Sequence, residues 1–266
     1  MKVTWEEPGW EDLGWERLAA GVGRCRLPVW DCTVGLVTWP GGALLIDAGS
    51  SLAEGAKVRR EAQALAGRRV DFLALTHAHF DHVFGAAAFA GAHVFAAGAP
   101  ENESAASSES SESSEFEKVG REVLRADAVR NGLDARAAEE AADTLVVPHQ
   151  YVRGNLTVAT PAGGPEVVLS VVGPGHTGSD LAVVVRGDGG PAVVFCGDLV
   201  EESGEPQAGP DAVPSRWPAA LDRVLALGGE DALYVPGHGA VVNAAFVRAQ
   251  RDALATRFGV SREPVD

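Results

Sequence analysis

The sequence has no run of about 18 consecutive apolar residues, so it predicts no membrane-spanning helix. Its first residues show no basic start followed by an apolar stretch, and we therefore expect no secretory leader. Cysteine is scarce, with 3 in 266 residues, which excludes a disulfide framework and fits a reducing compartment. These absences together predict a cytoplasmic protein that does not bind membranes.

Basic residues are also few, with 22 Lys and Arg against 37 Asp and Glu, for a formal net charge of −15. Nucleic-acid binding needs clustered cations, so nucleic acid is excluded as the main partner. Apolar residues make up 46% of the chain, which is enough for a full hydrophobic core. The length suits one large domain or two small ones, and the pattern of strands and helices described below favours a single domain over residues 1–266.

Two segments and one aromatic series stand apart from the rest of the chain. Residues 101–117 consist mainly of Ser and Glu, which predicts a mobile surface loop because such a segment has little apolar surface to bury. Residues 118–145, rich in Ala, Arg and Glu, predict a helical insertion. Near the start, Trp5, Trp10 and Trp15 are expected to anchor their segment to the body. A cleft wall or a dimer contact is the alternative for these tryptophans.

Apolar runs alternate with helical patterns in two similar halves. The expected strands are 32–39, 43–47, 70–76, 92–96, 155–159, 166–172, 181–186, 192–196 and 232–236. The expected helices are 53–66, 83–90, 216–227 and 243–258, with two more in the insertion. This alternation predicts an α/β fold with sheets inside and helices outside.

Five of the seven histidines follow predicted strands, and two aspartates occupy the same kind of position; these are His77, His79, Asp81, His82, His176, Asp198 and His238. Three histidines and an aspartate within six residues, after a buried strand, would be costly if they were unpaired. Imidazole and carboxylate together suit zinc, iron or manganese. The pattern therefore predicts a metal site.

The spacing of the first cluster suggests two metal positions. In an extended segment, residues two apart point the same way, so His77 and His79 can converge on one ion. Asp81 and His82 lie where the chain turns into the next helix and can face a second position. The later strand ends supply the remaining ligands.

The sequence resembles the metallo-β-lactamase superfamily in five elements, which occur in the family's order: Asp47-Ala48-Gly49, Thr76-His77-Ala78-His79-Phe80-Asp81-His82, Gly173-Pro174-Gly175-His176-Thr177, Gly197-Asp198 and Val235-Pro236-Gly237-His238-Gly239. The resemblance implies a four-layer αββα sandwich with a binuclear site. It implies one ion bound by His77, His79 and His176, and a second bound by Asp81, His82 and His238. It also implies that Asp198 bridges the ions and that a hydroxide between them is the nucleophile.

Two further roles complete the expected site. Asp81 is expected to receive or relay a proton in addition to binding metal. Asp47 is expected to orient the ligand loop through hydrogen bonds rather than to act on substrate. The cofactor expected here is a pair of divalent ions, zinc first, with iron and manganese also compatible with these ligands.

The resemblance implies hydrolysis of a small-molecule ester, thioester, lactone or amide. Asp198 stands where dedicated β-lactamases carry Cys or Ser, or close to it, so β-lactamase activity is an alternative only. Two others are a mononuclear-iron oxidoreductase of the persulfide-dioxygenase kind and a non-catalytic metal-binding protein. In this fold the substrate pocket is built from loops, here 1–30, 97–150 and 199–216. The oligomeric state, monomer or homodimer, is left open.

Overall fold

The computed structural model describes residues 9–98, 115–187 and 189–260. Trp5 lies outside the described residues, and so does the Ser/Glu-rich loop expected at 101–117 up to residue 114. Of that segment only the last three residues are described, as the start of a helix.

The first sheet has seven strands in the order β1 to β7: Glu16–Ala19, Val22–Arg26, Thr33–Trp39, Gly42–Ile46, Phe72–Leu75, His93–Ala97 and Gln150–Val152. Its first four strands are antiparallel, and the pairs from β4 to β7 are parallel. The central strands β4 and β5 are almost wholly buried, as expected of strands covered on both faces.

The second sheet has five strands in the spatial order β12-β11-β10-β9-β8. In chain order they are Asn155–Val158, Glu166–Val171, Leu181–Arg186, Val193–Glu201 and Leu233–His238. The strands β8 to β11 are antiparallel, and β12 runs parallel to β11. Because β11 and β12 are parallel, their carboxyl ends lie at the same edge.

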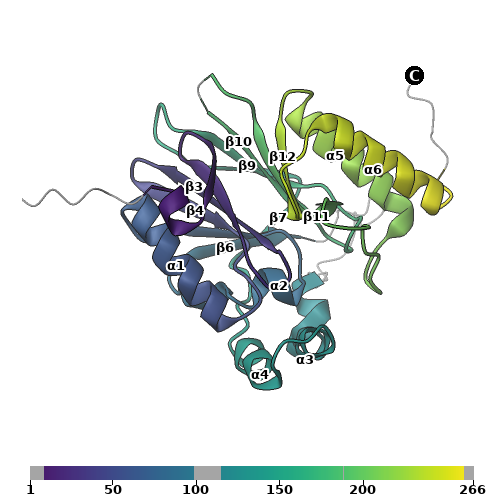
Figure 1. The fold of residues 1–266 in the computed structure, drawn as a ribbon, viewed down its shortest axis with the longest axis horizontal. Coiled ribbons are helices and arrows are strands. Elements are labelled where there is room, and N and C mark those ends of the chain that lie inside the picture. Colours follow the sequence, from purple (N-terminus) through teal and green to yellow (C-terminus); the bar gives the residue numbers. More distant parts are fainter. Residues whose placement is uncertain (1–8, 99–114, 188, 261–266) are drawn as a thin grey trace, which may run out of the picture.

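Helices cover the outer faces of both sheets (Figure 1). On the first sheet lie α1 (Leu52–Ala66), α2 (Phe80–Val83), α3 (Glu115–Arg130, broken at Gly120) and α4 (Ala135–Asp143), and on the second lie α5 (Trp217–Gly228) and α6 (Ala244–Arg257). Short 3₁₀ turns occur at Glu11–Leu13, Ala86–Phe89 and Pro214–Arg216. A third apolar cluster fills the space between the sheets. The predicted αββα sandwich is thereby confirmed.

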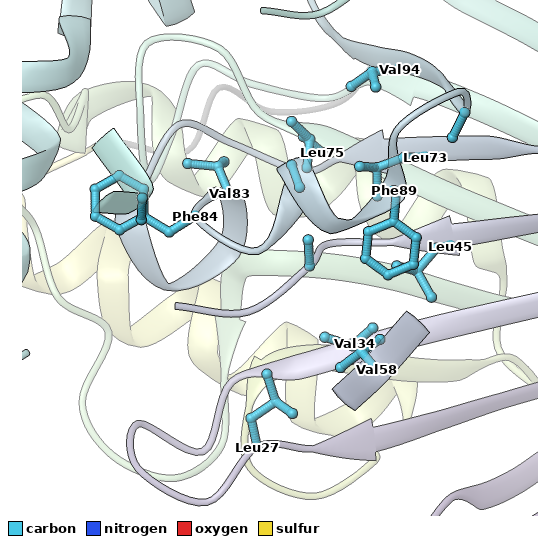
Figure 2. Packing of buried hydrophobic residues seen from close by; sticks show 14 of the residues in the cluster. Leu27, Val34, Leu45, Val58, Leu73, Leu75, Val83, Phe84, Phe89 and Val94 are labelled. Atoms are coloured by element: carbon cyan, nitrogen blue, oxygen red, sulfur yellow. The ribbon is translucent and has the colours of Figure 1, made fainter. Parts of the chain in front are cut away.

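The cluster under α1 illustrates the packing that fixes the first outer layer. Val58 of α1 lies over Val34 and Leu45 of the sheet, with Leu73 of β5 and Phe89 beside them (Figure 2). Apolar side chains of this size contribute about 1.5–3 kcal/mol each when they are fully buried. This layer holds β5 in place, and β5 leads directly into the His-rich segment.

The chain between β5 and β6 differs from the expected helix over 83–90. Helix α2 begins earlier, at Phe80, and ends at Val83, and a separate 3₁₀ turn follows at Ala86–Phe89. The helix is interrupted because the backbone N–H of Gly85 donates to the carbonyl oxygen of Gly49 at 2.9 Å rather than to the preceding helical turn. Gly85 also passes so close to Ala48 and Gly55 that a Cβ has no room there. The early start matters, since it places Asp81 and His82 within the helix itself.

The N-terminal segment forms a hairpin, β1–β2, that the sequence analysis did not predict. Trp15 is 1% exposed and donates from Nε1 to Glu61 of α1 at 3.2 Å, while Trp10 packs edge-on against it. The expectation that these aromatics anchor the segment is confirmed for both residues. Among the helices of the described residues, none is long and apolar enough to cross a membrane.

Trp15→Ala should lower the free energy of unfolding by about 3–5 kcal/mol, because it leaves a large cavity between the hairpin and α1. Val147→Ala is the control, since Val147 is 64% exposed and its truncation should change stability by less than about 0.5 kcal/mol. Chemical denaturation followed by circular dichroism measures both. Equal, small effects in the two variants would contradict an anchoring role for Trp15.

Candidate metal centre

The seven candidate ligands come from four places in the fold that meet at one edge of the two sheets. The first cluster follows β5: His77 in the connecting loop, His79 as the residue preceding α2, and Asp81 and His82 inside α2. The others are His176 in the loop between β9 and β10, Asp198 within β11 and His238 at the end of β12. Figure 1 shows α2 beside the ends of β11 and β12.

Asp198 lies at the centre of this group. Its Oδ2 is 3.6 Å from Nε2 of His77, 3.4 Å from Nε2 of His176 and 3.3 Å from Nε2 of His238. Its other oxygen, Oδ1, is 3.1 Å from Nε2 of His82. One carboxylate therefore faces both halves of the histidine cluster.

The donor atoms fall into two groups that share Asp198. Within 4.8 Å of one another lie single ligand atoms of His77, His79, His176 and Asp198, and a second such set is His82, Asp198 and His238. Asp81 joins the second set, with Oδ2 at 3.4 Å from His238 Nε2 and 3.7 Å from His82 Nε2. Ligand atoms around a four-coordinate zinc ion with bonds of about 2.0–2.1 Å lie about 3.3–3.4 Å apart. The spacing therefore suits divalent metal ions.

Unpartnered polar atoms give a second, independent test of this fit. His77 Nε2 and Asp198 Oδ1 are buried and have no hydrogen-bond partner among the described residues, although Asp198 Oδ1 has the close contact with His82 Nε2 given above. Buried polar atoms without partners cost free energy, and native structures rarely keep them unless an ion or water satisfies them. Both atoms face the centre of the cluster, where a cation would satisfy them.

Remote hydrogen bonds set which nitrogen faces the cluster in four of the five rings; the exception is His176, whose Nδ1 has no hydrogen-bond partner among the described residues. His79 Nε2 donates to Asp211 Oδ2 at 2.9 Å, which leaves Nδ1 free, 3.0 Å from His176 Nε2. His238 Nδ1 donates to the carbonyl oxygen of Trp30 at 2.6 Å, which leaves Nε2 free toward Asp198. A ring whose far N–H is held by an acceptor presents a lone pair on its other nitrogen, as a metal ligand must.

Asp47 orients two rings of the cluster in the same way. Its Oδ2 accepts from His82 Nδ1 and from Thr76 Oγ1, each at 2.8 Å, and its Oδ1 accepts from the Thr76 backbone N–H. Because the Thr76 hydroxyl donates to Asp47, it accepts from His77 Nδ1 at 3.0 Å. Asp47 thus lies behind the cluster, where it directs Nε2 of His77 and of His82 inward.

Two glycines allow the close backbone packing around Asp198. Gly197 has a φ of 54°, in the left-handed region, and a Cβ there would lie 2.9 Å from Thr76 Cβ. A Cβ on Gly237 of β12 would collide with Asp198 Oδ1. The register of β11 against β12 shifts at this point, and the shift turns Asp198 toward the histidines.

Burial and charge act differently on the two halves of the cluster. Burial lowers the pKa of His77 well below its ordinary value and lowers the pKa of His176 to about 4. Burial opposes the charged form of His238 too, but Asp198 and Asp81 outweigh it and raise the pKa of His238 to about 12. Burial would also raise the pKa of Asp198, yet the neighbouring His82 and His238 hold it well below its usual range. Burial therefore keeps His77 and His176 neutral, whereas the pKa of His79 is raised, because its hydrogen bond to Asp211 outweighs burial. The half around His238 holds protons.

A cavity of about 570 Å³ opens over the cluster, with His79, Asp81, His176, Asp198 and His238 on its floor. Its walls come from Trp30, from α3 and the residue after it, and from residues 201–211. These walls fall within the three pocket-forming segments expected from the resemblance. The volume is that of a site for a small molecule.

Sequence reasoning missed three residues next to the candidate ligands. Asp211 and Trp30 hold ligand rings, as described above, and Cys32 donates from Sγ to the carbonyl oxygen of Asp81 at 3.2 Å. Cys32 also lies 3.7 Å and 3.9 Å from the two ring nitrogens of His82. No local spacing in the sequence points to any of these three residues. Asp211, for example, is 132 residues from its partner His79.

Comparison with known proteins places this site in a family. The model of the metallo-beta-lactamase superfamily matches residues 27–238, a range that contains all seven candidate ligands. The chain therefore belongs to the metallo-beta-lactamase superfamily, whose members are mostly hydrolases. No curated protein sequence matches the chain.

Solved structures agree on the fold. A metallo-beta-lactamase from Hirschia baltica is 15% identical, with a TM-score of 0.59 over 90% of this chain and 96% of that one. The metallo-beta-lactamase FIM-1 from Pseudomonas aeruginosa, in a mono-zinc form, is 19% identical, with a TM-score of 0.58 over 93% and 96%. A metallo-beta-lactamase from Pontibacter korlensis is 18% identical, with a TM-score of 0.60 over 90% and 97%. At such identities the likeness establishes the fold alone.

Asp47→Asn should lower the free energy of unfolding of the metal-free protein by about 1–3 kcal/mol, because the new amide presents a donor to the donors of His82 and Thr76. Asn tolerates the φ of 59° at this position. Asp31→Asn is the matched control, since Asp31 has a φ of 61° and its carboxylate is partly exposed, with Arg26 and the backbone of Gly239 as partners that are not part of the cluster. Urea denaturation in a chelator should separate the variants; an equal loss in both would contradict the role of Asp47.

Proposed function

We propose that the protein is a binuclear metal-dependent hydrolase of a small ester, thioester, lactone or amide. The observation that carries this proposal is the position of Asp198, whose carboxylate lies within 3.6 Å of ring nitrogens from both sets. Its Oδ2 lies near His77, His176 and His238, and its Oδ1 lies near His82. A single carboxylate so placed suits a bridge between two ions. The hydrogen bonds behind the rings support the same assignment, because each leaves an inward lone pair.

The residues divide naturally between the two positions. We assign His77, His79 and His176 to one ion and Asp81, His82 and His238 to the other, with Asp198 shared. Imidazole with carboxylate suits zinc first, and iron or manganese next. When bound, such ions supply Lewis acidity toward a carbonyl oxygen and lower the pKa of water.

The chain's own groups would orient the reaction and handle the proton. Asp81 is 8% exposed, yet it lines the cavity floor, so its free carboxylate oxygen can accept a proton from the attacking water. The same oxygen can then return the proton to the leaving group. Trp30 and Phe80, whose rings meet edge-on at 5.2 Å, form an apolar wall that limits water beside the floor.

The rival functions receive less support from this geometry. A mononuclear iron oxidoreductase needs one set of ligands, whereas the described residues offer two sets that share Asp198. A purely structural metal site is usually closed, whereas this cluster opens into a cavity of small-molecule size. Only the shared fold supports β-lactamase activity. β-Lactams therefore remain one substrate class to be assayed.

Elemental analysis of protein purified without added metal should give about two zinc ions per chain and hydrolysis of model esters or thioesters. Asp198→Ala should reduce the content to about one ion and kcat by at least about a hundredfold, because it removes the shared ligand. Glu122→Gln, an exposed change on α3, should alter neither. About one iron per chain, with oxygen uptake on a persulfide, would instead support the oxidoreductase.

Metal uptake should depend on pH in one half of the site more than in the other. In the first set the pKa values of His77 and His176 are lowered and only that of His79 is raised, so the first ion displaces few protons. In the second set both His82 and His238 have a raised pKa and must lose their protons. The second ion should therefore bind more tightly as pH rises, displacing about one or two protons. Chelator competition between pH 6 and pH 8 measures this, and parallel, pH-independent affinities for both ions would contradict it.

A further inference from the structure

The cavity above the candidate metal centre has two chemically different walls. Trp30, Phe80, Val119 and Val123 form an apolar wall, and Val123 is 59% exposed although it is a large apolar side chain. The facing wall is the loop after β11, residues 201–211, which contributes Glu201, Ser203 and Glu205 among others. A bound molecule would contact hydrocarbon on one side and carboxylates on the other.

The charges lining the cavity are strongly unequal. Six carboxylates line it, and among the described lining residues Arg130 is the single Lys or Arg; the carboxylates are Asp81, Asp127, Asp198, Glu201, Glu205 and Asp211. Asp127 is paired with Arg130 at 2.8 Å, and Asp211 accepts from His79. Two divalent ions bound as proposed would outweigh Asp81, Asp198 and Asp211 by one positive charge, since a metal-bound His79 would be neutral. The wall itself adds the two negative charges of Glu201 and Glu205, which exceed that surplus.

These two glutamates have no counter-ion of their own. No Lys or Arg of the described residues forms a salt bridge with either of them. Glu201 is fixed in place, because its Oε1 accepts from the backbone N–H of Ser203 at 2.9 Å and from its hydroxyl at 2.6 Å. Arg257 reaches the same loop, but it donates to the carbonyl oxygen of Pro206 and does not line the cavity.

We propose that this wall selects substrates by charge, so that the protein prefers an ester, thioester or amide carrying an ammonium group over one carrying a carboxylate. The proposal rests on the proposed hydrolytic function and names its substrate class. Carboxylates on a low-dielectric wall concentrate cations at a cleft and repel anions. The apolar wall opposite would pack against the alkyl part of the same molecule. Since common β-lactams carry a carboxylate, they rank low on this argument.

The test compares three p-nitrophenyl esters on the zinc-loaded protein: 5-(trimethylammonio)pentanoate, its uncharged isostere 6,6-dimethylheptanoate, and the monoester of adipate. We expect kcat/KM to fall in that order at low salt, with the cationic ester at least about tenfold above the anionic one. The ratio should shrink as ionic strength rises, because salt screens partly exposed charges. Equal values, or a preference for adipate, would overturn the proposal.

Variants locate the source of the preference. Glu201→Gln with Glu205→Gln should reduce the cationic-to-anionic ratio to about threefold or less. Glu139→Gln with Asp143→Asn on α4 removes the same net charge away from the cavity and should leave the ratio and the activity unchanged. An equal fall in both double variants would assign the effect to net charge and overturn the role of this wall.

A binding measurement separates this inference from the hydrolytic function. Butyltrimethylammonium should bind the zinc-loaded protein in calorimetry, about tenfold more weakly after the Glu201 and Glu205 substitutions. Binding without any ester, thioester, lactone or amide hydrolysis would support charge selection and contradict the proposed function. Hydrolysis without salt-dependent ammonium binding would support the proposed function and contradict charge selection.

A further variant tests Arg130. If the protein prefers the adipate ester and Arg130→Gln abolishes that preference, then Arg130 leaves Asp127 to bind anions, and the inference is likewise overturned.

Discussion

The structure depends on the cost of burying many titratable groups in one small volume. Five imidazoles and two carboxylates meet at the sheet edge, and most of them are nearly inaccessible to solvent. In a low-dielectric interior such groups are tolerated only when each has a partner or a counter-ion. Around His238 and His82 the carboxylates supply that charge, whereas burial keeps His77 and His176 neutral. A divalent cation would resolve both situations, since it accepts lone pairs and compensates carboxylates.

The αββα sandwich supplies the rigidity that this arrangement needs. Each candidate ligand lies within an element or no more than a few residues from one, and the layers on both outer faces hold those elements by apolar contact. Small departures from regularity then aim the side chains: the register shift in β11, the lack of a Cβ at Gly237, and the early start of α2. Rigid elements place a site more accurately than mobile loops do.

Much of this could be predicted from the sequence because the signals are local. Apolar runs that end in His or Asp predict strand ends, and the spacing of His77, His79 and His82 can be recognised without knowledge of the rest of the fold. The hairpin β1–β2 was missed because its residues, such as Glu16 and Arg24, are polar although they pair in the sheet. Asp211 was missed for a different reason: its contact with His79 joins segments that only the folded chain brings together.

The contact between Asp211 and His79 also links the wall of the cavity to the candidate metal ligands. Residues 201–211 form the acidic wall of the cavity, and the last of them orients a candidate metal ligand. Trp30 does the same on the apolar side, because its ring forms the wall and its carbonyl oxygen holds His238. A change in either wall therefore acts on substrate contacts and on ligand orientation together. Substitutions that alter specificity without loss of metal should accordingly concentrate at residues such as Glu205 and Val123, whose side chains line the cavity without holding a ligand ring.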